Sequence, residues 1–212
     1  MEKEIIFLNN CERDRLFKCL NEIDTKYIVR DRALIRLAYY CALRISEISN
    51  LQLADFNPET REIKCNRIQR GLSNVLKITD DEVYKAVSEY YKLRSQNLSS
   101  PYFFISQQSS TISRITIHKL FKLYCEKANI DEKKRHFQVL RYSRVVELIS
   151  KGCSIDDIIW WTGLTYVSTS TIYKLYIDKM HEQDMLYNKN RREELYKKIE
   201  RGKNVSEEKN TE

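Results

Sequence analysis

The sequence predicts an α+β fold that is mainly α-helical and built around one hydrophobic core. Gly (4) and Pro (2) are scarce for 212 residues, so turns are few and helices should dominate. Apolar residues recur at helical spacing through most of the chain, whereas one stretch after residue 51 alternates apolar with polar residues. A hydrophobic content of 42% is enough to bury one substantial core.

We expect two helices first. One covers about residues 10–23, and the second ends at about residue 41. Asn9 or Asn10 can cap the first helix. The apolar positions recur every three or four residues, which places them on one face of each helix. They are Leu16, Phe17, Leu20 and Ile23 in the first helix, and Ala33, Leu34, Leu37, Ala38 and Cys41 in the second.

A small antiparallel sheet should follow these helices. Residues 51–56 lead into a turn at Asn57-Pro58, and a strand with alternating apolar and polar positions comes next. A further strand is expected over about 75–79, with Gly71 in the turn before it. The alternating strand has Ile63, Cys65 and Arg67 on one side and Lys64 and Asn66 on the other.

Helical periodicity then returns and continues to the end of the folded part. The expected helices cover about 80–93, 115–128, 138–150, 154–161 and 168–176. Ser154 and Asp157 have the spacing of a capping box, which fixes the start of one of them. Beyond His181 basic and acidic residues are equally frequent, with sparse apolar residues among them. We expect a docking helix over 181–202 and a disordered tail over 203–212.

The bulk properties narrow the class of protein. A formal charge of +7 suits a polyanionic partner without identifying one. No apolar run approaches the roughly 18 residues of a membrane span, and the first residues do not resemble a signal peptide, so we expect a cytoplasmic protein with no membrane partner. The six cysteines include no C-x-x-C pair, so reduced thiols are expected and no metal site.

Three segments contain residues suited to phosphate chemistry. They are Ala-Leu-Arg-Ile-Ser-Glu-Ile over 42–48, Gln-Val-Leu-Arg-Tyr-Ser over 138–143, and Thr-Gly-Leu-Thr-Tyr-Val-Ser-Thr-Ser-Thr-Ile-Tyr over 162–173. Arg44 and Arg141 are 97 residues apart, and Tyr173 follows Arg141 by 32. Each string alone is a weak signal, but the order and spacing of all three are hard to reach by accident.

These segments resemble the signature segments of the tyrosine recombinase (phage integrase) family, namely G-L-R-x-S-E-L, H-x-L-R-H-S, and L-G-H with a tyrosine nine residues later. The resemblance covers roughly residues 7–180. It implies a helical catalytic domain over 1–180 with a small three-stranded antiparallel sheet. It also implies a site-specific recombinase that cleaves and rejoins DNA through a 3′-phosphotyrosine, without cofactor, metal or small-molecule substrate.

The resemblance assigns Tyr173 as the nucleophile and Arg44 and Arg141 as the residues that hold the phosphate. Guanidinium groups present paired donors to the negative charge that develops on the phosphate oxygens during attack. Glu47 would orient Arg44 or stabilise the start of its helix, and Ser143 is a second supporting position. Tyr166 and Tyr176 are competing nucleophiles, but neither lies nine residues after Leu164.

Three catalytic positions depart from the family pattern. Arg70 stands at the lysine that protonates the departing 5′ oxygen, Gln138 at the first histidine of H-x-L-R, and Leu164 at the histidine or tryptophan of L-G-H. None can handle protons near neutral pH. Lys64 or Lys77 could replace the lysine, and His136 the histidine. The departures leave open a slow enzyme, an inactive DNA-binding accessory or regulatory relative, and a type IB topoisomerase-like activity.

The resemblance also implies partners. Family members assemble as tetramers on two duplex DNA sites, and the helix after the nucleophile docks on a neighbour, so 181–202 is either exchanged between subunits or folded back. Because barely ten residues precede the first pattern, we expect no amino-terminal clamp domain, as in the fimbrial phase-switch recombinases, which invert DNA. Integration, excision, inversion and resolution all stay open. Expected DNA contacts are His118, Lys119, Lys122, Lys133, Lys134 and Arg135.

Overall fold

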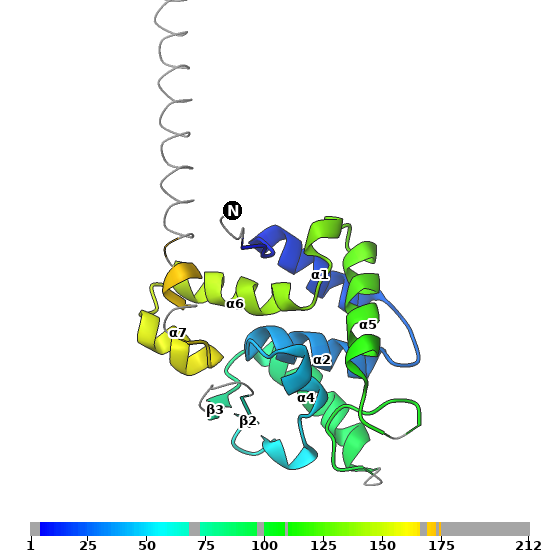
Figure 1. Ribbon diagram of the computed structural model, residues 1–212. Helices are drawn as coiled ribbons and strands as arrows, with labels where there is room; N and C mark the ends of the chain where they lie inside the picture. The colour runs from blue at the N-terminus through cyan, green and yellow to red at the C-terminus, as the bar shows by residue number, and fades with distance from the viewer. Residues whose placement is uncertain are drawn as a thin grey trace, which may run out of the picture. The chain divides into compact units, whose positions relative to one another are not determined.

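The computed structural model describes residues 5–67, 73–96, 100–108, 110–165, 169–172 and 174 (Figure 1). The chain divides into two compact units, Met1–Ile172 and Tyr173–Glu212, and every element named below belongs to the first. Of the second unit only Lys174 is described. The predicted docking helix over 181–202 and the predicted disordered tail over 203–212 therefore lie outside the described residues.

Helices make up most of this unit, and one small sheet accompanies them. The helices are α1 (Asn10–Glu22), α2 (Ile28–Tyr40), α3 (Ile45–Ser49), α4 (Asp81–Ser95), α5 (Arg114–Lys127), α6 (Gln138–Ser150) and α7 (Ile155–Thr162), with short 3-10 turns η1 (Leu53–Asp55) and η2 (Glu132–Lys134). The strands are β1 (Phe56–Asn57), β2 (Glu62–Cys65) and β3 (Asn74–Lys77). The predicted α+β class, mainly α, is confirmed, and the described residues of the last predicted helix, 169–172 and 174, are helical.

The sheet is antiparallel, in the order β1-β2-β3. Ile63 on β2 pairs with Leu76 on β3, and both side chains are fully buried. Lys64 pairs with Val75 on the opposite, exposed face. The alternation expected from the sequence therefore gives the sheet one face against the core and one toward solvent.

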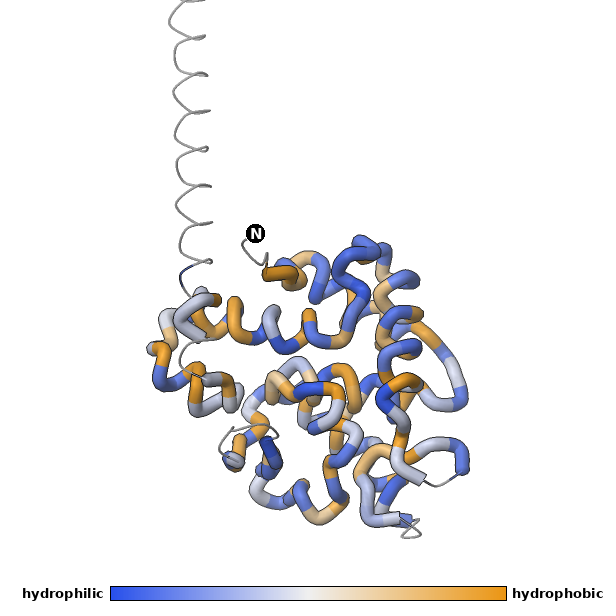
Figure 2. The backbone as a smooth tube through the Cα atoms, in the orientation of Figure 1, coloured by the Kyte–Doolittle hydropathy of each residue, from blue (hydrophilic) through white to orange (hydrophobic). Residues whose placement is uncertain are grey.

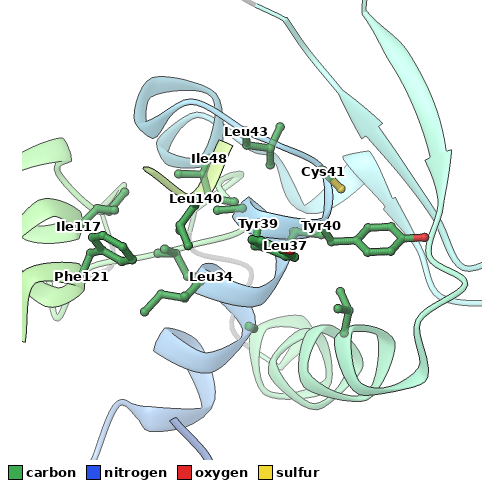
Figure 3. Close-up of a cluster of buried hydrophobic side chains, with 14 of the residues drawn as sticks. Leu34, Leu37, Tyr39, Tyr40, Cys41, Leu43, Ile48, Ile117, Phe121 and Leu140 are labelled. Atoms are coloured by element: carbon green, nitrogen blue, oxygen red, sulfur yellow. The ribbon is translucent and has the colours of Figure 1, made fainter. Parts of the chain in front are cut away.

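The central helix of the fold is α2, which is buried around most of its circumference and packs against α1, α4 and α6 (Figure 1). Figure 3 shows its Leu34 facing Phe121 and Ile117 of α5, with Leu140 of α6 beside them. Because elements far apart in the sequence all bury their apolar faces against α2, its C-terminal end is a fixed point for the segments that follow it.

Two of the helices, α1 and α7, begin at capping boxes that the sequence predicts or allows. The side chains of Asn9 and Ser154 accept hydrogen bonds from the third residue of α1 and α7, in capping boxes with Glu12 and Asp157. Gly163 caps the C-terminal end of α7 and has the left-handed conformation. Hydrophobic and hydrophilic residues are interspersed along α6, as Figure 2 shows. None of the described helices combines the length and apolarity that crossing a membrane requires.

Candidate active site

Arg44 immediately precedes α3, and Glu47 lies in the first turn of that helix. The backbone N–H of Arg44 donates to Glu47 Oε2 at 2.9 Å, and Arg44 Nη1 donates to Glu47 Oε1 at 3.0 Å. Glu47 therefore both closes the start of the helix and orients the arginine, the two roles that the sequence left as alternatives.

Glu47 is the centre of a buried ionic cluster. Its Oε2 lies 3.3 Å from Arg67 Nη1 and 3.7 Å from Arg141 Nη1, and its side chain is 1% exposed. Arg67 follows β2, and Arg141 lies in the first turn of α6. Three guanidinium groups thus surround one carboxylate, and the excess positive charge suits a bound anion such as a phosphodiester.

Arg141 is fully buried and only partly satisfied. Its Nη1 donates to the carbonyl oxygen of Ala42, whereas its Nε and Nη2 have no hydrogen-bond partner within the part of the chain that the structure describes. Burial and the nearby charge of Arg44 lower the pKa of Arg141 to about 9, and Glu47 opposes this shift. An anion that accepted hydrogen bonds from Nε and Nη2 would relieve the cost of the unpaired donors and the cost of the buried positive charge.

The backbone before Arg44 turns sharply at Ala42, which has a φ of 50°. This left-handed conformation directs the Ala42 carbonyl toward Arg141. It is unusual for a residue with a Cβ and costs glycine little. The turn therefore gives a physical reason why the signature that this segment resembles has glycine here.

Gln138 and Leu164 occupy positions that the sequence marked as altered. Gln138 begins α6 one turn before Arg141, so both lie on the same side of that helix. Leu164 is 8% exposed, and its backbone N–H donates to Thr162 Oγ1 at 3.2 Å. Its aliphatic side chain offers no donor to a phosphate.

Several predicted residues cannot be placed. Tyr173 and Arg70 lie outside the described residues, as do the competing nucleophiles Tyr166 and Tyr176.

The substitutes for the missing proton-handling groups can be placed. Lys64 and Lys77 lie on the exposed face of the sheet, opposite the face that buries Arg67, which favours neither lysine as the missing proton donor. His136 is half-buried two residues before α6, where burial and the neighbouring His118 lower its pKa.

Ser143 contacts a different part of the molecule from the arginines. Its Oγ donates to the Val139 carbonyl at 2.7 Å and accepts from the Leu8 backbone N–H at 2.8 Å. These bonds hold the segment before α1 against α6. The contacts of Ser143 thus support the position of α6 rather than the charge cluster itself.

The basic residues predicted to contact DNA fall into two groups. Lys119 and Lys122 are exposed on α5, and Lys133 is exposed on η2. Lys134 Nζ instead lies 2.7 Å from Glu12 Oε2, and Arg135 Nε donates to the Ile130 carbonyl at 2.8 Å. Lys134 and Arg135 are therefore committed to contacts within the fold.

Arg67 is the site residue that the sequence did not identify. It extends the buried side of β2, because Ile63, Cys65 and Arg67 occupy alternate positions. A charged residue at a position predicted to be buried requires a partner. The place of Arg67 on the apolar side of the alternating strand is therefore the feature of the sequence that could have identified it. The identity of the partner, Glu47, depends on tertiary structure.

No cluster of three or more potential metal ligands occurs among the described residues. All six cysteines are free thiols, and Cys41, Cys65 and Cys125 are buried.

A family model and several known proteins match this chain. The model of the phage integrase family matches residues 7–180. Tyrosine recombinase XerC of Caldanaerobacter subterraneus subsp. tengcongensis is 31% identical over 159 residues, covering 74% of this chain and 44% of the relative. Tyrosine recombinase XerA of Pyrococcus horikoshii is 28% identical over 165 residues, covering 74% of this chain and 56% of the relative. The chain spans about half the length of the curated relatives it matches.

Solved structures share the fold. The crystal structure of XerA recombinase matches with a TM-score of 0.72 and 21% identity, over 87% of this chain and 65% of that one. XerH recombinase bound to its palindromic difH substrate, in a post-cleavage complex, matches with a TM-score of 0.73 and 18% identity, over 88% of this chain and 54% of that one.

Proposed function

Because the chain belongs to the phage integrase family of tyrosine recombinases, we propose that it is a site-specific DNA recombinase, in which Tyr173 attacks a phosphodiester held by Arg44 and Arg141. The hydroxyl group of the tyrosine loses its proton and its oxygen forms a bond to phosphorus, while the bond from phosphorus to the 5′ oxygen breaks and that oxygen takes up a proton. The resulting 3′-phosphotyrosine conserves the energy of the broken bond. Attack by a 5′ hydroxyl reverses the step and rejoins the strand.

One observation carries the proposal: Arg141 is buried in a cluster with excess positive charge, and two of its donors are unpartnered among the described residues. Donors fixed before the reaction stabilise developing negative charge without reorganising. Arg44 is the arginine of the cluster that reaches solvent, because its side chain is 24% exposed. The pair suits a phosphate that is bound on one side by an exposed guanidinium and on the other by a buried one.

The partners we propose are duplex DNA and further copies of this chain. XerH in the matching structure is bound to its difH substrate, and a lambda integrase fragment of the same fold is a dimer bound to a core site. The exposed lysines of α5, Lys119 and Lys122, would contribute backbone contacts that give affinity without sequence readout. We also propose that residues 181–202 mediate contacts between subunits assembled on two DNA sites.

Trapping the covalent intermediate tests this function. Duplexes retained by the purified protein are selected from a randomised pool, and the selected site is remade with a nick beside the cleavage position so that the cut fragment diffuses away. The wild type should accumulate a covalent DNA adduct. Tyr173→Phe should bind the same duplex and form none.

The same experiment separates the competing functions. Binding of the selected duplex without any adduct from the wild type would contradict the recombinase proposal and favour an accessory DNA-binding protein. Relaxation of a supercoiled plasmid that lacks the selected site would instead favour a topoisomerase-like activity.

A further inference from the structure

We propose that Arg67 is a positioning residue of the active site: with Asn74, it clamps the C-terminal end of α7 to Glu47. The inference rests on the proposed function, which it deepens. Arg67 lies two residues after β2 and Asn74 begins β3, so the clamp lies at the turn end of the β2–β3 hairpin, next to the Cys65–Asn74 pair.

Every side-chain nitrogen of Arg67 has a partner. Nε donates to Asn74 Oδ1 at 3.2 Å, and Nη1 donates to Glu47 Oε2 at 3.3 Å. Nη2 donates to the carbonyl oxygens of Cys41 at 3.0 Å and Trp161 at 2.6 Å. The side chain is fully buried. Arg67 therefore differs from Arg141, whose open donors suit a ligand, and its contacts place it as a support.

The clamp acts on the last turn of α7. Helices end with carbonyl groups that lack partners within the helix and carry partial negative charge. Arg67 donates to the carbonyl of Trp161, and Asn74 Nδ2 donates to that of Trp160 at 2.5 Å. A guanidinium and an amide from the hairpin thus satisfy two carbonyl groups at the end of this helix.

The chain leaves the clamp at Gly163, where φ is 62°. A Cβ at this position would lie 2.8 Å from Cγ and 2.9 Å from Cδ of Arg67, so the backbone passes directly over the arginine stem. Leu164 follows, and Tyr173 comes nine residues after it. The clamp therefore fixes where the segment that leads to the nucleophile begins, relative to the carboxylate that orients Arg44.

Such a role should affect the cleavage rate more than DNA binding, because misplacing reacting groups by about 1 Å costs on the order of 100-fold in rate. The test compares Arg67→Met with Arg67→Lys, using the nicked duplex described above once the wild type has formed an adduct on it. The rate of adduct formation, the Kd for DNA and the thermal midpoint are measured for each variant. Arg61→Met is the matched control, because Arg61 lies beside the same hairpin but is 41% exposed and pairs with Asp81.

We expect Arg67→Met to form adduct about 100-fold more slowly while its Kd for DNA stays within about threefold of the wild type. Arg67→Lys should form adduct roughly tenfold faster than Arg67→Met but more slowly than the wild type. An ammonium group keeps the charge beside Glu47 but cannot reach every partner at once. Arg61→Met should cleave within about twofold of the wild type, since exposed pairs contribute little.

Asn74→Ser removes the second arm and leaves the Arg67–Glu47 pair. This variant should form adduct about tenfold more slowly than the wild type while its DNA affinity is unchanged. If Arg67→Met does not fold, the rate of adduct formation by Asn74→Ser tests the positioning role on its own. The inference would be overturned if Asn74→Ser formed adduct within twofold of the wild-type rate. It would also be overturned if Arg67→Met lost DNA affinity in parallel with its rate of adduct formation. Absence of adduct with the wild type itself would instead refute the proposed function.

Discussion

Glu47 meets Arg44 with both of its oxygens: Oε1 lies 3.0 Å from Arg44 Nη1, and Oε2 lies 2.9 Å from the Arg44 backbone nitrogen. Glu47→Gln removes the negative charge at the centre of three guanidinium groups. We expect the variant to lose about 3 kcal/mol of unfolding free energy, because breaking a buried ion pair leaves uncompensated charge. Urea unfolding measures the loss. The exposed Glu59→Gln should change stability by less than about 0.5 kcal/mol.

The buried charge of Arg141 should lower the unfolding free energy of the free protein and allow the protein to bind an anion. Because folding lowers its pKa to about 9, its charge weakens the fold at every pH below that value, neutral pH included. Arg141→Met should therefore raise the unfolding free energy by about 1–2 kcal/mol at pH 7 and abolish adduct formation. Inorganic sulfate should raise the thermal midpoint of the wild type but not of this variant. Equal stabilisation of both proteins by sulfate would argue against an anion site at Arg141.

Leu164→His tests whether the missing donor limits the rate. Leu164 is buried next to Gly163 and offers no polar group. A histidine there supplies a donor to the phosphate, so adduct formation should accelerate by about tenfold. Leu164→Met, which preserves size and apolarity, should leave the rate unchanged. A histidine variant no faster than the methionine variant would show that another step limits cleavage.

Glu147 on α6 should make stability depend on acid pH. Burial alone would raise its pKa, but hydrogen bonds from Lys151, Arg144 and Tyr39 lower it to about 2. The contribution to stability is therefore complete above the ordinary glutamate value of 4.5 and is lost as the pH falls toward 2. Glu147→Gln should cost about 2 kcal/mol at pH 7 and progressively less as the pH falls toward 2. Unfolding of both proteins across this range checks the sign, with Asp14→Asn as the exposed control.

The lysines of α5 should contribute to DNA affinity through phosphate contacts. Replacing both Lys119 and Lys122 by Gln should weaken binding of all duplexes and reduce the slope of log Kd against log salt by about 2. Lys134→Gln should leave that slope unchanged and lower stability instead, because Lys134 is paired with Glu12. A reduction of the slope by about 1 in Lys134→Gln, half that of the double α5 variant, would instead place Lys134 on the DNA.

Local signals in the sequence predicted most of the fold. The caps at Asn9 and Ser154 and the alternation from Ile63 act within a few residues, and the structure agrees with each. The second helix begins at Ile28, before its apolar stripe, and its first turn contains the buried Asp31, which pairs with Arg30 and Tyr124. That bond to Tyr124 joins segments that no helical periodicity relates.

The sequence predicts the motifs of the candidate site but not the contacts between their side chains. Arg44 and Glu47 are three residues apart, so their contact is local. Arg67 and Arg141 reach the same carboxylate from segments far apart in the sequence, so only the tertiary structure brings them together. The same limit applies to the basic residues before α6. The sequence shows that Lys134 is charged but not that Glu12 lies opposite it.

The contact between Gly163 and the stem of Arg67 restricts the order in which these positions can mutate. While Arg67 is present, any side chain at position 163 meets both an unfavourable backbone angle and a carbon less than 3 Å away. A shorter residue at position 67 removes the second obstacle, so a substitution at 163 is less damaging after the arginine has gone than before. The two positions should therefore show strong epistasis, although 96 residues separate them in the sequence.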